Sequence, residues 1–294
     1  MTTYPVTKVH KSYFTDTNGY LILPNNLKVG NYRIEEVTAP DGYTLSTNYV
    51  TVAVDTNTAY LMDATSGDAV IEVEYENKSV KGELTIYKQG EMLTAYDKDF
   101  RYELFGLSGV TFNVYAAEDI FTADRQGTLV YGKDALVATV VTDKDGYAKV
   151  TDLPLGKYYV KEASAPDGFV LNESAEKAVF VYADQNTPVV FDEVSFTNER
   201  QKVEITVEKQ DVETGNVLAN AVFGIYNAKD IVNKDGKIIV SADTLLQEMT
   251  TGVEGIATCT LDLPLGTYYV KELQAPAGYV SSDEVLTFDA SYQG

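Results

Sequence analysis

The stretch YYVKEASAPDGF at residues 158–169 has two further versions, YRIEEVTAPDGY at 32–43 and YYVKELQAPAGY at 268–279. Each copy follows a short turn that ends in a glycine, at Gly30, Gly156 or Gly266. The copies lie more than a hundred residues apart, whereas solenoid repeats have periods of roughly 20–50 residues. The sequence therefore predicts tandem modules, each carrying one copy of the motif.

The glutamate of this motif falls on an apolar face. Side chains of a strand alternate between its two faces, so Tyr158, Val160 and Glu162 share one face. The same alternation places Glu36 and Glu272 on the apolar face of the strand in the other two copies. A charged carboxylate among apolar neighbours points to a specific partner, because burial of an unpaired charge is costly.

Two other residue types repeat this pattern. Lysine ends an apolar stripe in GELTIYK at Lys88 and in VEITVEK at Lys209. Asparagine ends one in EVSFTN at Asn198 and in the stretch that leads to Asn77. Each asparagine precedes a lysine by 11 residues. Because buried lysine, glutamate and asparagine can satisfy one another, the pattern predicts one shared site per module, with the asparagine closing a module and the lysine opening the next.

Together, the strand ending in lysine, the motif E-x-x-A-P-x-G-[YF] and the final strand ending in asparagine mark a family. The chain resembles the Cna B-type, or SpaA-like prealbumin-fold, domains of Gram-positive surface adhesins and pilins. The resemblance covers essentially the whole chain. It implies an all-β fold of tandem Greek-key β-sandwich domains strung end to end. Composition agrees, because Tyr is abundant and Val and Thr run through alternating stretches, and these residues favour strands.

The resemblance also implies an intramolecular isopeptide bond. Lys88 would be the nucleophile, Glu162 the catalytic acid and Asn198 the acceptor, with ammonia as the leaving group. An apolar core lowers the pKa of a lysine and so yields a neutral amine. The alternative is a buried Lys–Glu–Asn hydrogen-bond cluster without a covalent bond.

The three predicted domains differ in completeness. The domain at 79–201 holds all three site residues. The domain at 1–78 has Glu36 and Asn77 but lacks its opening strands, since Lys8 and Lys11 lie too close to the turn TDTNGY. The domain at 202–294 has Lys209 and Glu272 but lacks its closing strand. The partners of Lys209 and Asn77 are thus expected outside the chain, which we interpret as a fragment of a longer surface protein. Strand exchange between the two incomplete domains would give weak head-to-tail self-association.

Charge and residue usage exclude several function classes. The formal net charge of −21 argues against nucleic acid and anionic membranes as partners. The sequence also has no 18-residue apolar run, which is the pattern that would predict a membrane contact. The single cysteine, Cys259, is expected to be a core or sheet residue, and the single histidine, His10, a surface residue. Acidic stretches with a glycine, such as TDKDGY, are interpreted as turns and not as calcium sites. We expect no cofactor, no metal and no enzymatic activity beyond autocatalytic bond formation.

The sequence favours a structural role at the cell surface. The expected function is the stalk or shaft of an adhesin or pilin in the cell wall of a Gram-positive bacterium, with sortase-linked pilin subunits or the cell wall as partners through regions outside the chain. An adhesin module that binds a host extracellular-matrix protein or a glycan, for example through the insertion at 91–107, is the alternative. An accessory β-sandwich of an extracellular carbohydrate-active enzyme is a weaker alternative.

The stretch 116–138 is expected to hold a short helical or irregular excursion and another strand.

Overall fold

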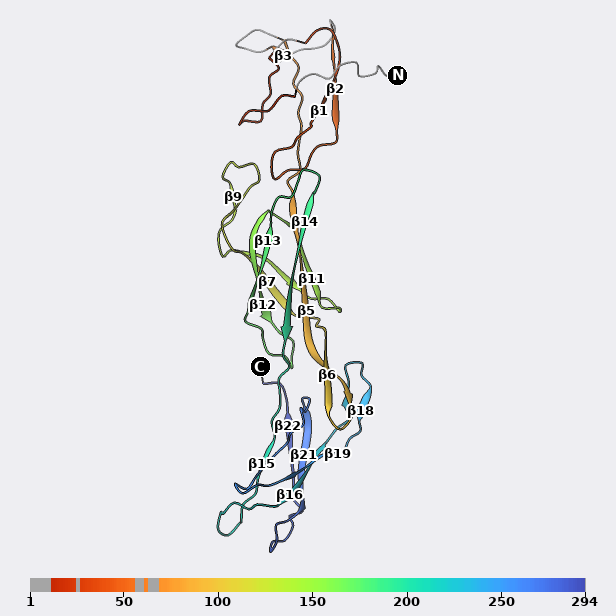
Figure 1. Cartoon of the computed structure of the whole chain (residues 1–294), viewed down its shortest axis with the longest axis vertical. Coiled ribbons are helices and arrows are strands. Elements are labelled where there is room, and N and C mark those ends of the chain that lie inside the picture. Colours follow the sequence, from red (N-terminus) through yellow and green to blue (C-terminus); the bar gives the residue numbers. More distant parts are fainter. Residues whose placement is uncertain (1–11, 25–26, 56–60, 63–68, 294) are drawn as a thin grey trace.

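The computed structural model of the protein describes residues 12–24, 27–55, 61–62 and 69–293. These residues form strands, turns and loops, and no helix occurs among them. The part of the chain so described therefore has no helix that could span a membrane. Figure 1 shows an elongated molecule in which strands gather in three successive groups. We refer to them as the N-terminal segment (residues up to 78), the central segment (79–201) and the C-terminal segment (from 202).

The central segment is a sandwich of two sheets. Its strands are β5 (Lys81–Tyr96), β6 (Phe100–Gly106), β7 (Thr111–Ala116), β8 (Ile120–Phe121), β9 (Leu129–Tyr131), β10 (Leu136–Val141), β11 (Tyr147–Leu153), β12 (Gly156–Ser164), β13 (Ala175–Phe180) and β14 (Val189–Asn198). One sheet has the order β10-β7-β12-β13 and the other β11-β5-β14, with β6 paired to the far half of β5. All these pairs are antiparallel except β14 and β5, which run parallel. The all-β sandwich prediction is confirmed.

Alternation along β5 builds the core between these sheets. Every second residue from Gly82 to Gly90 is buried, and its neighbours are half-exposed. Leu84 and Ile86 are fully buried in this row and pack with the inner faces of β7 and β12. Gly82 is required by close approach, because a Cβ there would lie 2.5 Å from the ring of Phe180.

The tyrosine that opens each motif copy fixes the turn before it. The hydroxyls of Tyr32, Tyr158 and Tyr268 each donate a hydrogen bond to the backbone carbonyl four residues earlier, at 2.8, 2.7 and 2.6 Å. Tyr158 and Tyr268 are buried, and burial raises the pKa of both. This shared contact explains why a glycine-ended turn and a tyrosine recur together.

The C-terminal segment repeats the central one. Its strands are β15 (Thr206–Glu208), β16 (Val222–Asn227), β17 (Ile231–Val232), β18 (Ile238–Val240), β19 (Leu245–Thr250), β20 (Ile256–Thr258), β21 (Gly266–Gln274) and β22 (Val285–Ala290). The main sheet has the order β19-β16-β21-β22, matching β10-β7-β12-β13, and β15 pairs with β20 as β5 does with β11.

The N-terminal segment is the least regular of the three. Its strands are β1 (Gly30–Glu35), β2 (Tyr49–Val54), β3 (Leu61–Met62) and β4 (Ala69–Val70). The expected closing strand that leads to Asn77 alternates between exposed and half-buried residues over 71–78, but it pairs with no strand among the described residues. In the central segment the equivalent strand, β14, pairs with the lysine-bearing β5. Lys8, His10 and Lys11 lie outside the described residues.

Of the two alternatives expected for the excursion in 116–138, helical or irregular, the structure has no helix in these described residues. The stretch forms the hairpin β8–β9 and then β10, so the irregular excursion and the further strand are present. Ile120 is 3% exposed and packs against Gly156 at the start of the motif strand. Burial of this side chain attaches the hairpin to the core of the central segment. The equivalent stretch of the C-terminal segment forms β17 and β18 in the same way.

Candidate functional site

Lys88 is the fully buried end of the apolar row on β5. Its exposed fraction is 0%, and Leu84 and Ile86 precede it on the same inner face. The rings of Phe112 and Phe196 lie 6.0 and 5.8 Å from its Nζ atom, measured to the ring centroids. The alternation of the strand thus places an amine in an aromatic and aliphatic surrounding.

Glu162 approaches from the opposite sheet. It lies on β12, on the face shared with the buried Tyr158 and Val160, and its side chain is 0% exposed. Asn198 ends β14, which lies beside β5 in parallel register with Phe196 opposite Lys88 and Asn198 opposite Gly90. Because residues two apart share a face, the amide of Asn198 lies on the same face as the amine of Lys88.

The three side chains form one closed hydrogen-bonded cluster. The Lys88 amine donates to Glu162 Oε2 at 2.8 Å. The Asn198 amide nitrogen donates to Glu162 Oε1 at 2.6 Å. The lysine amine also donates to the amide oxygen of Asn198. One carboxyl group therefore holds an amine and a carboxamide in contact, 74 and 36 residues away from it in sequence.

Burial changes the acid–base properties of the lysine. Removal from water lowers the pKa of Lys88, while its hydrogen bond to Glu162 acts in the opposite direction and is the smaller effect. A lowered pKa increases the fraction of neutral amine, which is the nucleophilic form. The arrangement can therefore bring a nucleophile to a carbonyl carbon next to a group that can transfer protons.

The N-terminal segment contains the glutamate and the asparagine of this cluster. The Asn77 amide nitrogen donates to Glu36 Oε2 at 2.7 Å and to the carbonyl of Thr44 at 2.8 Å. Among the described residues no lysine bonds to Glu36. The backbone N–H of Ser46 donates to the same carboxylate oxygen at 2.8 Å.

The C-terminal segment contains the lysine and the glutamate. Lys209 Nζ lies 3.2 Å from Glu272 Oε1 and 3.4 Å from Oε2. The lysine side chain is 20% exposed, whereas that of Lys88 is 0% exposed. The backbone N–H of Ser282 donates to Glu272 Oε2 at 2.7 Å, and Oε1 is buried with no hydrogen bond among the residues that the structure describes.

The two serines were missed by the sequence reasoning. Each lies 10 residues after its glutamate, at Ser46 and Ser282, where the central segment has Asn172 instead. In the central segment both carboxylate oxygens of Glu162 bond to Lys88 and Asn198. In the terminal segments a backbone N–H replaces one of these partners. The common spacing was a signal in the sequence, but a backbone donor leaves no trace in residue type.

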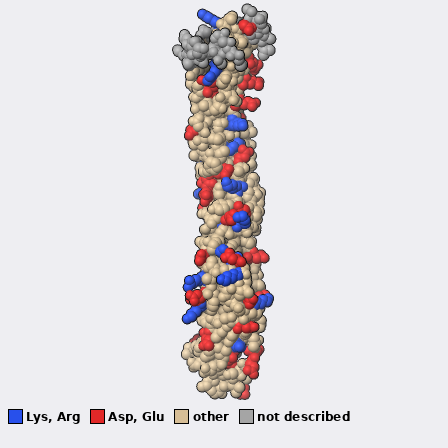
Figure 2. Space-filling view, turned by 90° about the vertical axis from the view of Figure 1, so that its right-hand side faces the viewer, with Lys and Arg blue, Asp and Glu red and all other residues tan. Residues whose placement is uncertain are grey.

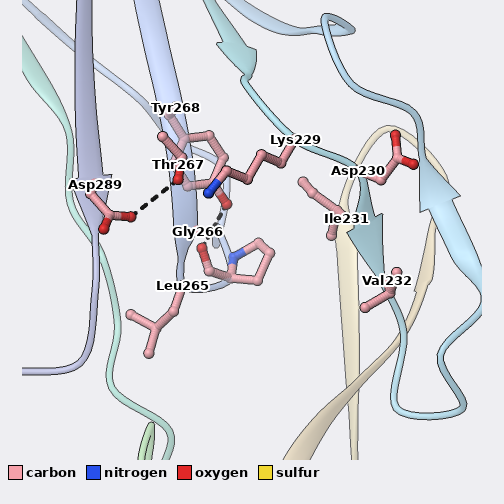
Figure 3. A pocket seen from close by; sticks show the side chains of 10 residues that line it. Lys229, Asp230, Ile231, Val232, Leu265, Gly266, Thr267, Tyr268 and Asp289 are labelled. Carbon is pink, nitrogen blue, oxygen red and sulfur yellow. Dashed lines mark hydrogen bonds between the residues drawn. The ribbon is translucent and has the colours of Figure 1, made fainter.

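A surface hollow of the C-terminal segment lies apart from these clusters. It has a volume of about 350 Å³ and lies between the turn that opens β21 and the strand β17 (Figure 3). Across it Thr267 donates to Asp289 at 3.2 Å, and Lys229 extends over the same opening. None of the three clusters contributes a lining residue. No group of histidine, cysteine and acidic side chains suited to a metal ion occurs in the described ranges.

Comparisons with known proteins show which family model and which solved structures this chain resembles. The family model "SpaA: Prealbumin-like fold domain" matches residues 2–68, 102–195 and 203–294. The solved structure of the Bacillus anthracis TIE protein is 30% identical with a TM-score of 0.60, covering 95% of this chain and 42% of that one. The chain thus spans less than half of the length of that protein. No curated protein matches.

Two pilin structures are also similar. A streptococcal ancillary pilin is 21% identical over 91% of this chain and 73% of its own, with a TM-score of 0.30. The shaft pilin SpaA from Lactobacillus rhamnosus GG is 18% identical over 73% of this chain and 95% of its own, with a TM-score of 0.29. The family model, however, matches most of the chain in all three segments, and the protein belongs to the family of SpaA prealbumin-like fold domains.

Proposed function

We propose that this chain is part of a structural stalk or shaft of a Gram-positive surface adhesin or pilin, stiffened by an isopeptide bond between Lys88 and Asn198. The three segments act as domains at 1–78, 79–201 and 202–294. The observation that carries the proposal is the buried cluster in which Glu162 bonds to both the amine and the carboxamide.

The reaction follows from these contacts. The neutral Lys88 amine attacks the side-chain carbonyl carbon of Asn198 and forms a carbon–nitrogen bond. Glu162 accepts a proton from the attacking nitrogen and delivers one to the departing amide nitrogen. The bond from that nitrogen to carbon breaks, ammonia leaves, and a secondary amide remains. No oxidant or cofactor is needed, and the folded core supplies the proximity.

The position of the bond suits a protein under tension. The central segment begins with β5 and ends with β14, and these two strands are adjacent and parallel. The chain therefore enters and leaves the sandwich at opposite ends. A bond from Lys88 to Asn198 would carry a pulling force directly between these strands, so that residues 89–197 between them would not be stretched.

The surface supports a stalk more than a binding module. The aromatic residues of the insertion at 91–107 are not exposed, since Phe100 is buried and Tyr96, Tyr102 and Phe105 are half-buried. Figure 2 shows acidic and basic side chains mixed along the rod without a single-sign patch on that face. By analogy with pilins, we propose an extracellular location and association with other pilin subunits or the cell wall. Binding to host matrix or glycan remains the alternative.

Intact-mass measurement tests the proposal. The wild-type chain should be lighter than its sequence mass by one ammonia, because among the described residues only the central segment has the lysine, glutamate and asparagine in contact. Glu162→Gln keeps the shape of the side chain but removes the proton-transfer group, and its mass should equal its own sequence mass. The matched control is Glu272→Gln, which should still lack one ammonia. A wild-type mass equal to the sequence mass would leave only the hydrogen-bonded cluster.

A further inference from the structure

The long strand β5 extends beyond its own sandwich. After Gly90 it continues to Tyr96, turns at 97–99, and returns as β6 with Tyr96 opposite Phe100 and Gln89 opposite Gly106. Figure 1 shows this β5–β6 hairpin next to β18 of the C-terminal segment. The residues that contain the predicted insertion thus form an arm that reaches the next segment.

The tip of the hairpin belongs to the hydrophobic core of the C-terminal segment. Phe100 is 7% exposed, and every other buried member of its cluster lies between Ile205 and Val270. Leu93, Tyr96 and Tyr102 pack against the same cluster, which extends the apolar contact along both strands of the hairpin. Part of the core of one segment is therefore supplied by another.

Backbone and side-chain hydrogen bonds fix the hairpin in place. The carbonyl of Leu93 accepts from the backbone N–H of Lys234 at 2.9 Å, and that of Thr94 accepts from the Asn233 amide at 3.3 Å. On the other strand, the Tyr102 hydroxyl donates to the carbonyl of Asp262 at 3.0 Å. Contacts on both strands resist rotation of the hairpin about its long axis.

A buried arginine closes the same junction. Arg200, two residues beyond Asn198, is 7% exposed, and its guanidinium carbon lies 3.8 Å from the centroid of the Tyr102 ring. The guanidinium pairs with the carboxylate of Asp262 and donates to the carbonyl of Leu263 at 3.4 Å. Its Nε lies 3.7 Å from Glu91 Oε2. Cation–π contact and ion pairing thus join the hairpin, the chain just after β14 and the loop before β21.

The junction of the N-terminal and central segments is built differently. Gln185 accepts hydrogen bonds from the backbone N–H groups of Ala39 and Leu45, at 2.9 and 2.8 Å. The ion pair of Arg125 and Asp41, at 3.0 Å, is exposed on both sides and so contributes little. Among the described residues, neither of these two segments inserts a strand into the core of the other.

We propose that the β5–β6 hairpin is a splint that makes the central and C-terminal segments one cooperative, stiff unit, with Arg200 as its lock, and leaves the first junction as the more flexible joint. This inference deepens the proposed stalk function by naming its stiff and flexible joints. It holds with or without a bond between Lys88 and Asn198.

Cys259 offers a native probe of the splint. It is the single thiol of the chain, lies in the same core as Phe100 and is buried, and burial raises the pKa of its thiol. Its reaction with a thiol reagent in the full chain therefore requires opening of the C-terminal segment. We expect labelling to be at least ~100-fold faster in Phe100→Ala and about 10-fold faster in Arg200→Met.

Matched controls separate the splint from a general loss of stability. Phe121→Ala removes a half-exposed phenylalanine from the hairpin β8–β9, and Arg101→Met removes an exposed arginine next to Phe100. Both should label within ~2-fold of the wild type. Unchanged labelling in Phe100→Ala would overturn the proposal. Complete opening of the C-terminal segment in that variant would support it, because Phe100 belongs to the central segment.

Spin-label distances test the stiffness directly. In a Cys259→Ser background, Val181→Cys and Val253→Cys place labels at exposed positions of the central and C-terminal segments. Their distance distribution should be narrow and should broaden in Arg200→Met. The pair Val37→Cys and Val181→Cys across the first junction should be broader from the start. Equal widths at both junctions would refute the inference, and a missing ammonia in the same sample would show that the stalk proposal is unaffected.

Discussion

An apolar replacement of the whole buried cluster separates a covalent cross-link from a hydrogen-bonded one. The variant Lys88→Met/Glu162→Leu/Asn198→Leu replaces all three polar side chains of the cluster by apolar ones and leaves no pair able to react. All three side chains are almost fully buried, so the change is confined to the interior.

The two interpretations predict opposite signs. Lys88 and Asn198 are 110 residues apart, and by the loop-entropy argument used for disulfides a cross-link of that span stabilises the folded state by about 5 kcal/mol. If the bond exists, the variant loses this contribution. If only a hydrogen-bonded cluster exists, replacing buried charges by apolar side chains is neutral or stabilising by ~1–4 kcal/mol.

Urea unfolding measures the difference. With m-values of about 1–3 kcal/mol per M, loss of the cross-link should lower the midpoint for the central segment by at least ~2 M. The control Lys209→Met/Glu272→Leu alters the incomplete cluster of the C-terminal segment, in which no described asparagine bonds to Lys209 or Glu272. This control should lose no cross-link contribution. A variant at least as stable as the wild type would refute the covalent interpretation.

Two further predictions concern pH and packing. In Glu162→Gln the unlinked Lys88 stays buried with a lowered pKa, so the unfolded state binds more protons below its ordinary value of 10.5. Stability is therefore lost as pH falls through the lowered pKa and rises with pH between the two values. Below pH 10.5 the slope should not exceed about 1.4 kcal/mol per pH unit, and it should vanish in Lys88→Met/Glu162→Gln. Separately, Gly82→Ala should destabilise the chain by ~1–3 kcal/mol in chemical unfolding, because its Cβ would meet the Phe180 ring. Gly132→Ala, whose Cβ would meet only a side-chain oxygen 3.9 Å away, is the control; equal effects would contradict the packing argument.

Much of the central cluster could be predicted because the pattern that marks each of its residues lies within a single strand. A strand alternates with period two, so the positions of Lys88, Glu162 and Asn198 within apolar stripes placed each on an inward face. Alternation does not show which of these inward faces pack against one another. The structure supplies this through the parallel pairing of β14 with β5 and the placement of β12 in the facing sheet.

The hairpin of 91–107 shows where local information ends. Its length marked it as an insertion, and its aromatic residues fitted a binding loop as well as a buried surface. Only contacts with residues more than a hundred positions away, such as Tyr102 with Asp262, assign it to the next segment. The stretch 116–138 left a helical and an irregular excursion open for the same reason, because the contact of Ile120 with Gly156 joins residues that are distant in sequence.

The fold class, the three motif copies and the residue types of the site could be predicted from the amino-acid sequence. Period-two alternation, turn glycines and charged residues on apolar faces can each be recognised within a single strand or turn. Tertiary structure alone decided that one carboxyl group contacts both the amine and the amide, that serine backbone groups complete the terminal clusters, and that Arg200 and Phe100 join two segments. These contacts are stabilised when strands that are distant in sequence pack together and exclude water. The local sequence of one strand does not show which distant strand will pack against it.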